Sequence, residues 1–152
     1  MKTQTQSVLE LWQEARTRLT RQLEKISATD LKKTLRPSQN SVGFLLRHIG
    51  DVELLFAKNV FGSADISVHA KTLIAQRDTG EWTDLEELIG YLKYASECLE
   101  TIIEMQPDTA WEQQISTIEF GVKTKAEAIG RIVSHTAYHA GQLALVLKYG
   151  KQ

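Results

Sequence analysis

The sequence has little of what marks an exported protein. Cysteine occurs once, at Cys98, so the 152-residue chain can form no internal disulfide. A chain without disulfides suits a reducing compartment. The first residues carry one positive charge but no apolar run behind it, whereas a signal peptide needs an apolar core of about 7–15 residues. We therefore expect a cytoplasmic protein.

Long apolar runs and an excess of either charge are also missing. The longest uncharged stretch, residues 132–147, includes two histidines and falls short of the roughly 20 apolar residues that span a bilayer. The net charge is −1, whereas a domain that binds nucleic acid typically has a markedly basic face. The sequence thus predicts neither a membrane helix nor a nucleic-acid partner.

The composition that remains is that of an ordinary folded domain. Apolar residues make up 42% of the chain and charged residues 24%, which is within the globular range. A single hydrophobic core typically serves roughly 100–200 residues. We therefore expect residues 1–152 to form one domain.

Four segments carry apolar residues at the spacing of an amphipathic helix. They cover about residues 7–26, 41–61, 83–106 and 124–149. Outside them the sequence indicates only a short turn at residues 30–35 and a piece of extended chain at residues 115–120. This pattern predicts an all-α fold, a four-helix bundle.

Each predicted helix has a start signal. Ser7 with Glu10, Thr83 with Glu86 and Thr124 with Glu127 have the spacing of a capping box, in which a hydroxyl and a carboxylate satisfy exposed amides. The second helix has Asn40 or Ser41 as its cap. These signals support the four helices independently of their apolar spacing.

The links between the predicted helices are long, about 14, 21 and 17 residues against roughly 2–8 in simple bundles. The second link is long enough to return along the bundle, which would make the second and third helices parallel. The sequence therefore favours an up-down-down-up topology with a long crossover connection between helices two and three.

Three of the four histidines fall on inward faces of predicted helices. His135 and His139 are one turn apart on the last helix, so their imidazoles project from the same face. His48 shares the apolar face of the second helix with Phe44 and Val52. His69 lies in the polar second link, where we expect an ordinary loop residue.

Three inward imidazoles can hold a divalent metal ion and leave one coordination position open. A lone inward histidine is more often a hydrogen-bonded core residue, but a one-turn pair together with a third inward histidine favours a metal. We therefore predict that His48, His135 and His139 bind one divalent ion, with zinc or nickel expected first. The ligand set also accepts cobalt and iron.

Several residues close to the histidines in the sequence could support the metal site. Gln142, one turn beyond His139, could bond a bound water or substrate or serve as a helix-contact amide. Asp51 or Glu53 could orient an imidazole, although we expect Glu53 to face solvent. Gly141, inside a helix, suggests that a neighbouring element packs closely there.

We expect no role in the site for Arg47, Arg131 and Cys98. Arg47 and Arg131 could meet an anionic substrate, but solvated charges are the more common reading of such positions. Cys98 on the third helix has no neighbour in the sequence that would lower its pKa, so we expect a packed residue rather than a nucleophile.

Two motifs resemble the DinB family, the broad group that includes bacillithiol S-transferases and mycothiol-dependent maleylpyruvate isomerase. Residues 41–49 read SVGFLLRHI, and residues 135–143 read HTAYHAGQL. The resemblance covers essentially the whole chain, and it implies an up-down-down-up bundle, frequent dimers and a metal site at His48, His135 and His139. Ala140 stands where many relatives have arginine, so an anion contact from that position is missing.

The resemblance also implies a use for the metal. In characterised branches of the family the ion binds a low-molecular-weight thiol and presents it to an electrophile. The leading hypothesis is therefore a metal-dependent thiol transferase that acts on a small molecule and forms a homodimer. The alternatives are a hydrolase that uses metal-bound water, a non-enzymatic binding or stress-response module braced by the ion, and an ion-free helical bundle.

Overall fold

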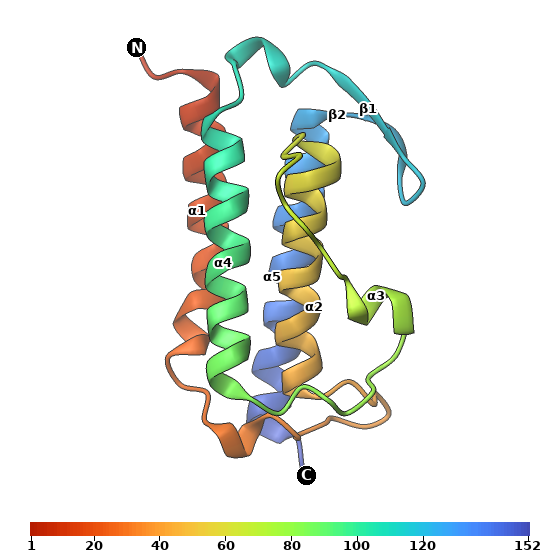
Figure 1. The fold of residues 1–152 in the computed structure, drawn as a ribbon. Helices are drawn as coiled ribbons and strands as arrows, with labels where there is room; N and C mark the ends of the chain where they lie inside the picture. The colour runs from red at the N-terminus through yellow and green to blue at the C-terminus, as the bar shows by residue number, and fades with distance from the viewer.

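The computed structural model describes residues 1–152 and is mostly helical, with one small sheet (Figure 1). The four long helices are α1 (Gln4–Leu23), α2 (Val42–Leu55), α4 (Leu85–Glu104) and α5 (Lys125–Tyr149). The expected all-α character is confirmed in this broad form. No helix combines the length and apolarity that crossing a membrane requires.

The long helices lie side by side along one direction, with α2 against both α4 and α5 and α1 against both α5 and α4. In Figure 1, α1 and α5 begin at the upper end of the molecule, whereas α2 and α4 begin at the lower end. The link between α2 and α4 returns along the outside of α2 and carries the short helix α3 (Lys71–Ala75).

The helix starts follow local capping chemistry, with two changes from the expected residues. Thr124 and Glu127 form the predicted capping box of α5, and the Ser41 hydroxyl accepts from the Phe44 amide at the start of α2. In contrast, α1 is capped by Thr3 rather than Ser7, and Asp84 rather than Thr83 caps α4. Both corrections move a start by a few residues at most and leave the apolar faces in place.

The other elements are short. The end of the second predicted helix is a π-helical turn, Phe56–Val60. The predicted turn before α2 is a 3-10 turn at Ala28–Asp30, slightly earlier than expected. The extended piece is β1 (Gln114–Thr117), which pairs antiparallel with β2 (Gly121–Thr124) to form a hairpin that precedes α5.

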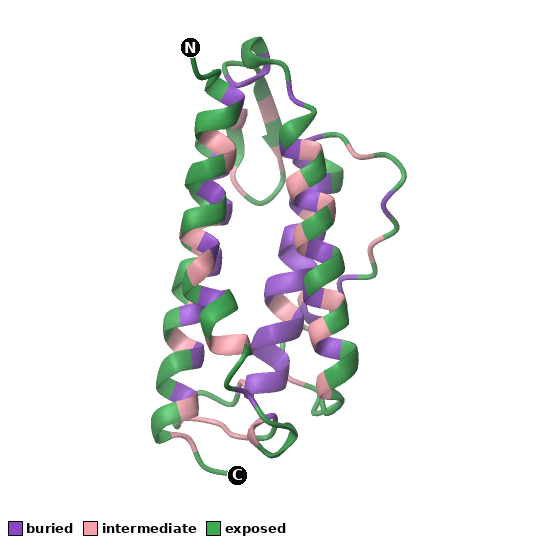
Figure 2. Ribbon diagram, turned by 90° about the vertical axis from the view of Figure 1, so that its left-hand side faces the viewer, coloured by how far each residue is buried: buried purple, intermediate pink, exposed green.

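The core follows the inward faces of the helices, which Figure 2 shows as buried residues along each ribbon. Helix α2 differs because nearly all of its residues are buried, including Arg47, Asp51 and Glu53. The link containing α3 covers the side of α2 that would otherwise face solvent. Gly43 permits the close approach of the link, since a Cβ there would lie 1.9 Å from the Trp82 carbonyl oxygen. Gly50 permits the close approach of α4, since a Cβ there would lie 2.7 Å from the Tyr91 ring.

The burial of α2 overturns two expectations. Glu53 does not face solvent but is fully buried and paired with Arg16 of α1. Arg47 is not a solvated charge, because its guanidinium bonds Asp51 and lies 3.9 Å from the centre of the Tyr91 ring. The sequence showed only one apolar face on this helix. The polar residues outside that face are covered by α1, which supplies Arg16, and by the link, which has no apolar periodicity.

Candidate metal centre

The structure brings together the three histidines predicted from the sequence. His48 comes from α2, and His135 and His139 come from adjacent turns of α5. One ring nitrogen from each lies within 4.8 Å of the others, and all three side chains are half-buried. Because α2 and α5 pack directly on each other, the cluster spans a helix–helix contact.

Two of these rings have their orientation fixed by a hydrogen bond at Nδ1. His139 Nδ1 lies 2.7 Å from Oε1 of Gln142, and His48 Nδ1 lies 3.1 Å from Oγ1 of Thr72. A carbonyl oxygen can only accept, so His139 donates from Nδ1. In a neutral imidazole this leaves Nε2 with a free lone pair, which is the form that binds a metal.

The third ring has a different environment. His135 Nε2 lies 3.1 Å from His48 Nε2, and His135 Nδ1 is buried without a hydrogen-bond partner. Two nitrogens bound to one zinc ion at about 2.0–2.1 Å in tetrahedral geometry are about 3.3 Å apart. The observed separation therefore fits two ligands of one ion, and the donor set is one that zinc and similar ions accept.

Burial keeps the three imidazoles neutral. Loss of solvation, together with the neighbouring histidines, lowers the pKa of His48 to about 4 against the opposing charge of Asp51, and lowers the pKa of His135 to about 3. Burial also lowers the pKa of His139, against the opposing effect of its bond to Gln142. At neutral pH the rings therefore offer lone pairs rather than positive charges.

We expect the metal-free protein to lose stability as the pH falls from about 6.5, the pKa of an unfolded histidine. The folded rings have lower pKa values, so below 6.5 the unfolded chain binds protons that the folded chain does not. The free energy of unfolding therefore decreases with falling pH until the folded pKa values are reached. Urea denaturation across this range measures the effect.

The variant His135→Gln provides the comparison, because it removes one titrating ring. Its denaturation midpoint should depend less on pH than that of the wild type. A wild-type midpoint that stays constant or rises between pH 6.5 and 5 would contradict the burial of the histidines.

Of the other residues discussed from the sequence, most lie as expected and one does not. Gln142 is a direct partner of His139, so it has a more specific role than a helix contact. Gly141 has no atom within 4 Å of an added Cβ, and the expected close packing there is wrong. Arg131 is exposed, as expected, with Glu119 at 3.8 Å. Cys98 is half-buried and packs against the apolar core, and His69 lies in the link as expected.

Sequence reasoning missed Thr72. This residue lies in α3, 2% exposed, and places its hydroxyl on His48. No motif or periodicity marks it, because its position depends on how the long link folds back over α2. The sequence gives only one signal for it, a hydroxyl side chain within the long link.

One cavity opens directly beside the histidines. It has a volume of about 370 Å³ and lies between α2, α5 and the hairpin. His135 forms part of its wall with Val52 and Phe56, while Arg131 and Glu119 lie at its edge. This cavity offers a small molecule an apolar wall, a charged edge and access to one member of the cluster.

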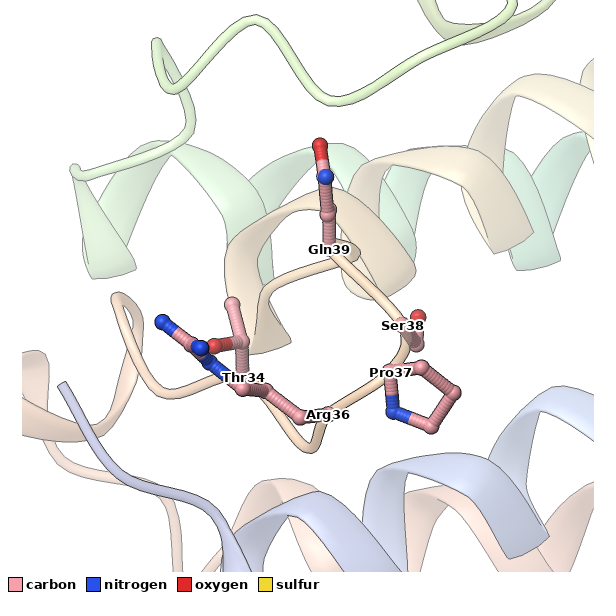
Figure 3. Close-up of a pocket in the computed structure, with 5 residues that line it drawn as sticks. All are labelled: Thr34, Arg36, Pro37, Ser38 and Gln39. Carbon is pink, nitrogen blue, oxygen red and sulfur yellow. The ribbon is translucent and has the colours of Figure 1, made fainter.

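A larger cavity lies elsewhere. It measures about 710 Å³ and is lined by residues of the loop before α2, none of them hydrophobic. Figure 3 shows that Arg36, Pro37 and Gln39 point in different directions rather than toward a common point. The loop thus lacks the convergence of side chains found at the histidine cluster.

Comparison with known families shows which family the chain belongs to. A family model for the DinB superfamily matches residues 7–143. The chain belongs to the DinB superfamily. The resemblance read from the two motifs is therefore confirmed, and the matched region of this DinB protein contains all three histidines, Thr72 and Gln142. No curated protein and no solved structure matches the chain.

Proposed function

We propose that this DinB protein binds one divalent metal ion, zinc or nickel first, through His48, His135 and His139. The observation that carries the proposal is the convergence of three neutral imidazoles from two helices, within 4.8 Å of one another. Membership of the DinB superfamily supports it. Three protein ligands leave a position for a further group on the ion.

We further propose that the protein is a transferase that joins a low-molecular-weight thiol to an electrophilic small molecule. A bound divalent ion would favour the thiolate form of such a thiol near neutral pH. The chain offers no sulfur nucleophile of its own at the cluster, since its one cysteine is half-buried and packs against the apolar core. The attacking sulfur therefore has to come from a second molecule.

The residues around the cluster have separate tasks in this proposal. Thr72 and Gln142 hold two imidazoles in place through Nδ1. Val52 and Phe56 form the apolar part of the wall of the cavity beside His135. Arg131, at the edge of the same cavity, can attract an anionic group of the substrate.

The test of the transferase is a screen of metal-loaded protein. Bacillithiol, mycothiol, glutathione and coenzyme A are each offered with a reactive electrophile, and loss of free thiol is measured. We expect consumption above background with at least one thiol, and none with the His135→Ala variant. Equal rates with and without the protein for all four thiols would exclude the transferase.

The position of the cluster also supports a second candidate, a non-enzymatic module braced by the ion. An ion shared by α2 and α5 would tie two helices together, and metal binding to the folded state adds to its stability. Chelation separates the two functions. If the metal-free chain unfolds, the ion is structural, whereas a fold that survives chelation favours an exchangeable ion.

We also propose how the chain is organised. The helix directions in Figure 1 support an up-down-down-up four-helix bundle in a single domain, residues 1–152. We propose a homodimer located in the cytoplasm. Exposed apolar side chains along one face of α5 support the dimer, namely Tyr138, Leu145 and Tyr149. Sedimentation of the purified protein tests the dimer.

A further inference from the structure

A buried carboxylate on α2 is connected to the metal centre through the link. Asp51 is completely buried and accepts four hydrogen bonds. Its Oδ1 accepts from Arg47 Nε at 2.8 Å and from the Tyr91 hydroxyl at 2.6 Å. Its Oδ2 accepts from the Thr72 amide at 3.0 Å and from the Thr72 hydroxyl at 2.7 Å.

These contacts fix the direction of each hydrogen bond. A carboxylate has about four acceptor sites and no proton to give, so all four partners have to donate. The single proton of the Thr72 hydroxyl is therefore committed to Asp51. The remaining Thr72 lone pairs face His48 Nδ1 at 3.1 Å, so Nδ1 carries the proton in that contact. The lone pair of neutral His48 then lies on Nε2, which faces His135.

Asp51 is itself held from two sides. The Arg47 guanidinium also donates to the His69 carbonyl oxygen at 3.1 Å, which ties the link to α2. Tyr91 approaches from α4 across Gly50, where a Cβ would lie 2.7 Å from its ring. Asp51 therefore holds Thr72, which belongs to α3, at a defined position against His48 of α2.

We propose that Thr72, held by Asp51, is the positioning residue that fixes the tautomer and rotation of His48 for metal binding. The long link between α2 and α4 is then part of the metal centre rather than a connection only. The carboxylate that holds Thr72 is that of Asp51 and not that of Glu53, which accepts from Arg16 of α1. This inference rests on the proposed metal site.

The first measurement needs no variant. Nitrogen chemical shifts of metal-free wild-type protein report which ring nitrogen of each histidine carries the proton. We expect His48 to be a single tautomer protonated at Nδ1. A His48 ring protonated at Nε2 would overturn the proposal, whether or not the protein binds metal.

The second measurement compares substitutions at Thr72. Thr72→Val keeps the shape and the backbone bond to Asp51 but removes the hydroxyl, whereas Thr72→Ser restores it. We expect Thr72→Val to weaken zinc affinity about 10–100-fold, the usual effect of losing an outer partner of a ligating histidine, and to give a mixture of His48 tautomers. Thr72→Ser should recover both the affinity and the single tautomer.

The matched control is Thr5→Val. Thr5 is also a buried threonine whose hydroxyl donates, to the Gln106 carbonyl oxygen at 2.8 Å, and accepts, from Trp111 Nε1 at 2.8 Å. This variant should leave zinc affinity and the His48 tautomer unchanged. Equal zinc affinity in Thr72→Val and Thr5→Val would overturn the positioning role. A wild type that binds no zinc but has the expected tautomer would instead refute the metal site.

Discussion

Replacing His135 by alanine is expected to weaken zinc binding by more than about 100-fold, the upper end of what losing only an outer partner costs. His135 contributes a nitrogen that lies 3.1 Å from His48 Nε2. Its removal leaves two ligands on different helices. Two imidazoles satisfy half of a tetrahedral shell, so the remaining positions would fall to water. Competition titration with a chromophoric chelator measures the loss.

The matched control for this substitution is His69→Ala. The contribution of His69 to the fold includes its backbone carbonyl oxygen, which accepts from Arg47 and is retained in the variant. We expect wild-type zinc affinity in His69→Ala. If both variants bind zinc equally well, the ion does not sit at the predicted cluster.

A thermal measurement gives an independent readout of the same prediction. A ligand at 100 times its dissociation constant stabilises the folded state by about 2.7 kcal/mol. Zinc should therefore raise the melting temperature of the wild type and of His69→Ala, and leave that of His135→Ala nearly unchanged. A zinc-induced rise of equal size in all three proteins would place the ion elsewhere.

The histidine cluster could be predicted because its geometry is mostly local. His135 and His139 share a helix face whatever the tertiary structure is, and His48 lies on the apolar face of another helix. The apolar periodicity that marks a helix also marks its inward side. Bringing the three together then required only that two helices pack on these faces.

What could not be predicted depends on the long link. Thr72 and the burial of Arg47 both follow from chain that folds back over α2, and this segment has no periodic pattern to reveal its position. Gly141 shows the opposite error, because a glycine inside a helix suggested close packing and the structure has open space beside it. Single residues indicate local conformation well and tertiary neighbours poorly.

The buried pair of Arg16 and Glu53 could not be predicted either, because it joins two helices, α1 and α2, at positions far apart in the sequence. It has the largest expected effect on stability. Arg16 of α1 donates from Nε to Oε1 at 2.8 Å and from Nη2 to Oε2 at 3.1 Å, with Glu53 fully buried. Burial raises the pKa of Glu53, and Arg16 opposes this rise. The carboxylate thus depends on the guanidinium to remain charged inside the bundle.

Arg16→Ala is expected to lower the free energy of unfolding by about 3–5 kcal/mol, because it leaves a buried acidic group without its partner. The exposed pair Lys93–Glu97, 3.8 Å apart, supplies the control. Lys93→Ala should cost less than about 1 kcal/mol, as surface pairs usually do. The double variant Arg16→Met/Glu53→Leu removes both charges together and should recover most of the loss. Urea denaturation measures all three, and a loss in Arg16→Ala no larger than that in Lys93→Ala would show that Glu53 needs no partner.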